Sequence, residues 1–282
     1  MSTRPLPVPP LVTLSTSAVP LPRPATWCRI ARDAGVDGVD LDLSGQPLPR
    51  PGRLLATAER LDVPIRSIWV PRSGIWTGWR FEYGMAAAAA LANATAANWL
   101  VIDAPAAVNG AFPLAMLTAR TEALRARLTS PIGVVVAMRP RQLEGGRRHL
   151  VLMTALRRMA EEWEFDVALD LVGVIDPRWE AEAVVSRLGN RLRMIRVGSD
   201  VVREPGNGRN RASVRALAAA IDGGHLNRFA IVPKVSVWQM GHAAALARAG
   251  AAARQRITDR YSAVEEQRIL DAFPHPWPGH RA

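Results

Sequence analysis

The sequence predicts a single α/β domain, a closed (β/α)8 TIM barrel with an extra C-terminal helix. Eight short β-branched runs alternate with longer segments rich in alanine, leucine and arginine. The spacing from strand to strand is roughly 25–35 residues, the length of one βα unit, and the chain of 282 residues suits one such barrel. No GxGxxG follows the first strand, which disfavours an open dinucleotide-binding sheet.

Strict alternation implies parallel strands, which need helices over their outer face. The expected strands are Leu11–Thr16, Gly38–Leu43, Pro64–Val70, Trp99–Asp103, Ile132–Met138, Val167–Leu171, Arg193–Val197 and Arg228–Val232. The expected helices are Thr26–Ala34, Arg53–Leu61, Met85–Ala97, Pro113–Leu128, His149–Trp163, Trp179–Leu188, Ser213–Ile221 and Gln239–Arg254, with Tyr261–Phe273 as the extra one. Gly35 and Gly189 stand where helix-ending glycines are expected. We expect the barrel over residues 11–273, a flexible segment over 1–10 and a tail over 274–282.

Composition narrows the class of protein. The chain is 49% hydrophobic, and its single cysteine, Cys28, excludes an internal disulfide framework. No membrane helix or secretion signal is expected, so the predicted location is cytoplasmic. Lysine plus arginine number 36 against 25 acidic residues, but the basic residues are spread along the chain, which favours solvated surface charge over a nucleic-acid site.

Two stretches carry a family pattern. The first is Leu14-Ser15-Thr16 followed by Ile30-Ala31-Arg32-Asp33-Ala34-Gly35-Val36-Asp37-Gly38-Val39-Asp40-Leu41. The second is Pro205-Gly206-Asn207-Gly208, then a helix and Gly223-Gly224-His225-Leu226. Both stretches resemble the xylose-isomerase-like TIM barrels, the sugar phosphate isomerase/epimerase superfamily, which includes an apurinic-endonuclease branch.

The resemblance implies a divalent metal held by Glu, Asp and His at the carboxyl ends of strands five to eight. This chain departs from that pattern. Ala137 stands near the expected glutamate, Arg196 near the expected histidine, and Val232-Pro233-Lys234 where another glutamate is expected. Only Asp170, with Asp40 or Asp42 on the second strand, remains as an oxygen ligand. We therefore expect no metal site and no cofactor.

Positive charge replaces the expected ligands. Arg72, Arg139, Arg196 and Lys234 all lie at carboxyl ends of strands, which meet at one mouth of a closed barrel. Asp103 and Asp170 end the fourth and sixth strands and are the internal partners available to these cations. Two interpretations stay open: the cations bind an anionic small molecule, or they form ordinary ion pairs inside an inactive barrel.

Two further features bear on the mouth. Lys234 is the only lysine, and it is either a base or nucleophile of lowered pKa or a plain ion-pair partner. The chain has nine tryptophans against two tyrosines. The tryptophans at the expected mouth, which would either stack on a sugar ring or pack the loops, are Trp69, Trp76, Trp79 and Trp238.

The sequence thus predicts an isomerase/epimerase-like barrel that binds a small polar, anionic, sugar-like ligand without the usual divalent metal. If the chain is an enzyme, Asp170 or Asp103 would move protons, while Arg139, Arg196 and Lys234 would stabilise an enediolate-like charge. The alternative is a catalytically silent barrel that acts as a binding or assembly subunit. Self-association into a homo-oligomer is compatible with either function.

Overall fold

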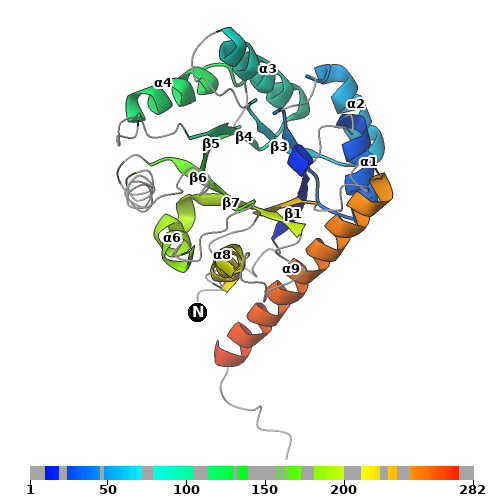
Figure 1. Cartoon of the computed structure of the whole chain (residues 1–282), viewed down its shortest axis with the longest axis vertical. Helices are drawn as coiled ribbons and strands as arrows, with labels where there is room; N and C mark the ends of the chain where they lie inside the picture. Colours follow the sequence, from blue (N-terminus) through cyan, green and yellow to red (C-terminus); the bar gives the residue numbers. More distant parts are fainter. Residues whose placement is uncertain are drawn as a thin grey trace, which may run out of the picture.

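The eight strands close into one parallel barrel in sequence order, as the sequence predicts (Figure 1). The computed structural model describes residues 10–18, 24–44, 48–71, 79–104, 113–129, 132–138, 158, 162, 164–172, 181–199, 211–222, 228–233 and 242–272. The strands are β1 (Leu11–Ser15), β2 (Val39–Asp42), β3 (Ile65–Trp69), β4 (Trp99–Asp103), β5 (Gly133–Met138), β6 (Asp166–Asp170), β7 (Leu192–Gly198) and β8 (Arg228–Val232). β8 pairs with β1 through Leu11 and Arg228, which closes the barrel.

Helices surround the barrel on its outside (Figure 1). Those in the described residues are α1 (Pro24–Ala34), α2 (Pro51–Leu61), α3 (Trp79–Thr95), α4 (Leu114–Arg125), α6 (Ala181–Leu188), α8 (Arg211–Asp222) and α9 (Ala243–Ala272), with short 3-10 helices η1 (Thr16–Ala18) and η3 (Gly189–Arg191). Most of the expected helix over 149–163 lies outside the described residues. Gly35 and Gly189, predicted to end helices, have φ of 65° and 45°, which only glycine adopts at little cost.

The last helix differs from the prediction. The sequence predicts two helices, Gln239–Arg254 and Tyr261–Phe273, whereas α9 is one continuous helix of 30 residues. The segment between the two predicted helices continues the helix and has contacts with the rest of the domain. Ile257 is buried, Arg254 pairs with Asp37, and Arg260 pairs with Asp222 at the end of α8.

The strand register stacks the inward side chains in layers of four, each layer drawn from alternate strands as in other barrels of this kind. The layer nearest the carboxyl ends holds Asp42, Asp103, Asp170 and Val232. The layer below it holds Ser15, Trp69, Ala137 and Arg196. Next come Asp40, Val101, Ala168 and Ala230, and then Thr13, Ser67, Val135 and Met194. The lumen is therefore acidic at its mouth and mixed below.

Packing at the amino-terminal end of the lumen explains why residue 133 is a glycine. Gly133 begins β5 beside Trp99 of β4. A Cβ built on Gly133 would overlap the Trp99 ring. The ring occupies the space that any larger residue at 133 would need, so the indole packs directly on the backbone of β5.

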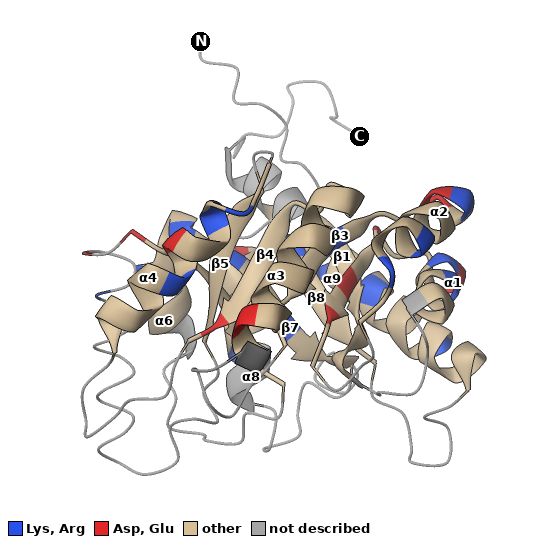
Figure 2. Ribbon diagram, turned by 90° about the horizontal axis from the view of Figure 1, so that it is seen from above, with Lys and Arg blue, Asp and Glu red and all other residues tan. Residues whose placement is uncertain are grey.

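The excess of basic residues is distributed rather than gathered. Arginines occur on α1, α2 and α4 with acidic residues among them (Figure 2). Several are in ion pairs, such as Arg32 with Asp33 and Arg158 with Glu162. Among the described helices, none is both long enough and apolar enough to cross a membrane.

Candidate functional site

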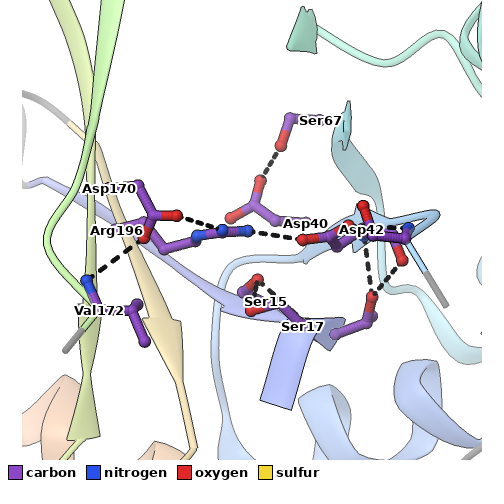
Figure 3. Close-up of polar contacts among 10 residues, drawn as sticks. Ser15, Ser17, Asp40, Asp42, Ser67, Asp170, Val172 and Arg196 are labelled. Carbon is purple, nitrogen blue, oxygen red and sulfur yellow. Dashed lines mark hydrogen bonds and ion pairs between the residues drawn. The ribbon is translucent and has the colours of Figure 1, made fainter. Parts of the chain in front are cut away.

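A single arginine links opposite sides of the barrel mouth. Arg196, on β7, donates from Nη1 to Asp42 Oδ2 of β2 at 2.9 Å and from Nη2 to Asp170 Oδ2 of β6 at 2.5 Å. β2 and β6 lie four strands apart in the ring of eight. Figure 3 shows the guanidinium lying between the two carboxylates. Because all three side chains are at most 4% exposed, the bridge is an interior ion-pair network rather than a surface contact.

Each carboxylate is also held by its own strand end. Asp42 Oδ1 accepts a hydrogen bond from the Ser44 amide at 2.9 Å, and Asp170 Oδ1 accepts one from the Val172 amide at 3.3 Å. In both cases the donor lies two residues further along the chain, as in an Asx turn. The same arrangement therefore fixes both carboxylates, one oxygen to the backbone and the other to Arg196 (Figure 3).

The guanidinium of Arg196 also contacts the aromatic ring of Trp69. Arg196 Cζ lies 3.8 Å from the centroid of the Trp69 ring, well inside the usual limit for a cation–π contact. Trp69 is 2% exposed and neighbours Asp42 in the strand register. The ring and the two carboxylates together fix the position and the plane of the cation.

Electrostatics favour the charged form of Arg196. Burial by itself lowers the pKa of Arg196, but the charges and hydrogen bonds of Asp170 and Asp42 outweigh burial and raise the pKa above its ordinary value. Two carboxylates against one guanidinium leave this trio with a formal charge of −1. The trio as a whole is therefore anionic, although an arginine lies at its centre.

A second buried ion pair lies deeper in the lumen. Arg228, at the start of β8, donates from Nη2 to Asp40 Oδ1 at 2.5 Å. Asp40 also accepts hydrogen bonds from the hydroxyls of Thr13 and Ser67. Here burial lowers the pKa of Arg228, and the single carboxylate of Asp40 does not reverse that shift. This pair joins β8, β1, β2 and β3 across the seam where the barrel closes.

The structure brings together three of the residues singled out in the sequence: Asp170, Arg196 and Trp69. Asp103 ends β4 in the same layer as Asp170 and is half-buried. Trp79 begins α3, and its side chain is outside the description. The remaining predicted site residues, which lie outside the described residues, are Arg72, Trp76, Arg139, Lys234 and Trp238. The roles assigned to all of these residues stay predictions.

Sequence reasoning missed the partnership of Asp42 with Arg196 and the whole Arg228–Asp40 pair. The available signal was the spacing Asp40-x-Asp42, which puts two carboxylates on one face of a strand. That pattern identified Asp42 only as an oxygen ligand. Its actual partner is 154 positions away in the chain, and local patterns do not encode such a distance.

The metal ion that the family resemblance implies does not fit the described residues. The carboxylate oxygens of Asp42 and Asp170 that face the lumen are bound by the guanidinium nitrogens. Within the described part of the chain, no group of three or more His, Cys, Asp or Glu side chains is arranged to hold a metal. A cation is present at the mouth, but it is covalently part of the chain.

Solved structures with the same architecture cover nearly the whole chain. An L-ribulose 3-epimerase superposes with a TM-score of 0.67 at 13% identity, covering 96% of this chain and 100% of its own. A sugar phosphate isomerase/epimerase from Parabacteroides distasonis ATCC 8503 gives 0.64 at 7% identity, covering 91% and 98%. A D-allulose 3-epimerase from Methylomonas sp. in complex with D-allulose gives 0.61 at 11%, covering 90% and 98%.

The chain thus has the fold of the xylose-isomerase-like TIM barrels. No family model and no curated protein matches its sequence. Together with the low identities, this shows that the fold is shared while most of the sequence differs.

Proposed function

We propose that this chain binds a small sugar-like ligand at the carboxyl-terminal mouth of the barrel without a divalent metal, as an isomerase/epimerase-like protein. The observation that carries the proposal is the Asp42–Arg196–Asp170 bridge, which holds a guanidinium between two carboxylates at the barrel mouth. A guanidinium presents hydrogen-bond donors and keeps its charge at any physiological pH. Its N–H groups can donate hydrogen bonds to a sugar oxygen, including a developing oxyanion, although the two carboxylates leave the bridge without a net positive charge.

The chemistry of the bridge bears on the charge of the ligand. Two carboxylates already balance Arg196, so the bridge itself attracts hydroxyl groups more readily than a phosphate or a carboxylate. Preference for an anion, expected from the sequence, then depends on Arg72, Arg139 and Lys234. One binding experiment with a neutral sugar and a sugar phosphate can therefore show which kind of ligand the mouth prefers.

Asp103 is the best placed of the predicted proton-transfer groups. Asp170 is 4% exposed, and Asp103, in the same layer of the mouth, is the more exposed of the two. A general base must come within hydrogen-bond reach of the proton that it removes. We therefore assign proton transfer to Asp103 and the orientation of Arg196 to Asp170.

The experiment combines binding with exchange. Thermal shifts are recorded with neutral ketoses, sugar phosphates and acidic sugars, with chelator and then with divalent metals. Exchange of substrate C–H for solvent deuterium is followed by NMR with any compound that binds. We expect stabilisation that chelator does not remove, and exchange that Asp103→Asn abolishes while the exposed control Asp33→Asn does not. Stabilisation that chelator removes would contradict the proposal.

A catalytically silent barrel is the second candidate, and a specific observation favours it. Asp170 and Arg196 are bound to each other and buried, so this pair of predicted site residues already has internal partners. In that case the chain binds ligand or partner through its mouth without turnover. Binding of a sugar without any deuterium exchange would support this alternative over an active isomerase.

A further inference from the structure

We infer that the space between Asp42 and Asp170 is a guanidinium site, shaped for a planar forked cation and unsuited to a metal ion even when Arg196 is removed. This inference concerns the cation itself and does not depend on which ligand the mouth binds. Three features of the described residues carry it: the separation of the two carboxylates, their independent anchoring, and the aromatic face beside them.

The separation of the carboxylates matches a guanidinium. One oxygen lies 2.9 Å from Nη1 and the other lies 2.5 Å from Nη2, and the two oxygens are on opposite sides of the group (Figure 3). The gap between the oxygens therefore spans two hydrogen bonds and the fork itself. Metal ions such as Mg²⁺ and Ca²⁺ bind oxygen at about 2.0–2.6 Å. One such ion can contact Asp42 or Asp170 directly, but not both.

The carboxylates do not depend on Arg196 alone for their positions. The Ser44 amide holds Asp42 and the Val172 amide holds Asp170, each through the oxygen that Arg196 does not use. Both aspartates also end strands of the closed sheet. Removing the arginine side chain therefore leaves two negatively charged groups facing each other at nearly the same separation, and burial makes this arrangement unfavourable without a cation.

The aromatic face adds selectivity for a flat cation. Trp69 lies 3.8 Å from the guanidinium carbon, a distance at which a planar guanidinium stacks on the indole while a hydrated metal ion gains little. An alkylammonium is a point charge and cannot reach both carboxylates with a fork. The site thus ranks guanidinium above ammonium and above divalent metals.

Chemical rescue of Arg196→Gly tests this inference. The full-length variant is refolded from urea. Its melting temperature is then measured in 20 mM guanidinium chloride and, for comparison, in 20 mM sodium, methylammonium or magnesium chloride. With a dissociation constant of about 5 mM, 20 mM guanidinium should raise the melting temperature by roughly 1.5–2 °C over sodium. We expect no such rise with methylammonium or magnesium.

Controls separate a site from a general salt effect. The parent chain should show no rise, because its own arginine fills the site. Arg196→Gly combined with Asp170→Asn should lose the rise, because one carboxylate is gone. Arg228→Gly, which removes the arginine paired with a single carboxylate, should respond less than Arg196→Gly.

Two outcomes would overturn the inference. One is an equal response to guanidinium in the parent and in Arg196→Gly. The other is a response to magnesium as large as the response to guanidinium, which would mean that the space accepts a metal. If Arg196→Gly does not fold in sodium chloride, the refolding yield replaces the melting temperature, and failure to fold in guanidinium as well contradicts the inference.

Discussion

Arg196 and Arg228, the two arginines buried in the lumen among the described residues, both pair with aspartates but have opposite shifts in pKa. Arg196 faces two carboxylates and an indole ring, and its pKa is raised. Arg228 faces one carboxylate, and its pKa is lowered. Burial acts in the same direction on both. At Arg196 two carboxylates outweigh burial, whereas at Arg228 a single carboxylate does not, and the positive charge of Arg66 lowers the pKa further. The surroundings of Arg196 at the mouth therefore favour a buried positive charge, whereas those of Arg228 deeper in the lumen offset only part of the cost of burying one.

The largest effect should follow from removing the upper cation. Arg196→Met keeps much of the side-chain volume but leaves Asp42 and Asp170 buried without their counter-ion. We expect the free energy of unfolding to fall by about 3–5 kcal/mol, as is typical when one partner of a buried ion pair is removed. Urea denaturation at pH 7 measures it. A loss below about 1 kcal/mol would show that the bridge does not stabilise the barrel.

Removing the lower cation should have a smaller effect. Arg228→Met leaves only Asp40 unneutralised, and the hydroxyls of Thr13 and Ser67 still donate to that carboxylate. We expect a loss of about 2–3 kcal/mol in the same urea experiment. A loss equal to or greater than that of Arg196→Met would show that the lower ion pair stabilises the barrel at least as much as the upper one.

Cys28 extends the comparison to a buried group without a counter-ion. Burial raises the pKa of its thiol to about 11 from an ordinary value of 9.0. Between these values the unfolded chain loses the thiol proton and the folded chain keeps it, so stability falls as pH rises. From pH 8 to pH 11 this should remove about 2 kcal/mol in the parent, at 1.36 kcal/mol per unit.

The alanine variant isolates the thiol from every other titrating group. Cys28→Ala lacks the thiol, so the difference in stability between parent and variant should shrink by that amount over the same pH range. Urea denaturation at each pH measures it. A constant difference would show that the thiol ionises equally in the folded and unfolded chains.

An exposed pair gives the smallest effect and sets the baseline. Arg260 bonds both oxygens of Asp222 at 3.0 and 3.1 Å, but both side chains are about half exposed. Solvent screens such pairs, so Arg260→Ala should change the free energy of unfolding by only about 0–1 kcal/mol. A larger loss would mean that this contact fixes the course of α9, because it joins that helix to α8.

Much of the fold could be predicted from the sequence because it rests on local patterns. Trp99–Asp103 and Arg228–Val232 are strands with the predicted bounds. The last helix is the exception: the sequence predicts two helices, Gln239–Arg254 and Tyr261–Phe273, where the structure has one. In the folded chain the middle of α9 contacts Asp37 and Asp222, residues that are distant in the sequence.

The candidate site was less predictable than the fold. Asp170 and Arg196 could be placed at the mouth because each ends or nearly ends a strand, and strand ends of a parallel barrel converge. Whether Arg196 faces a ligand or an internal partner could not be predicted from that position. The described structure shows an internal partner on each side of Arg196, together with Trp69, for which the sequence left ligand stacking and internal packing open.

The sequence by itself determined the eight-fold alternation, the parallel strands and the absence of the expected metal ligands at strands five, seven and eight, because each follows from residues near one another in the chain. Only the tertiary structure decided how the charges pair. Arg196 meets Asp42 across 154 positions and Arg228 meets Asp40 across 188. The physical reason is that closure of the barrel turns distant strand ends into neighbours, and a buried charge is stable only where such neighbours neutralise it.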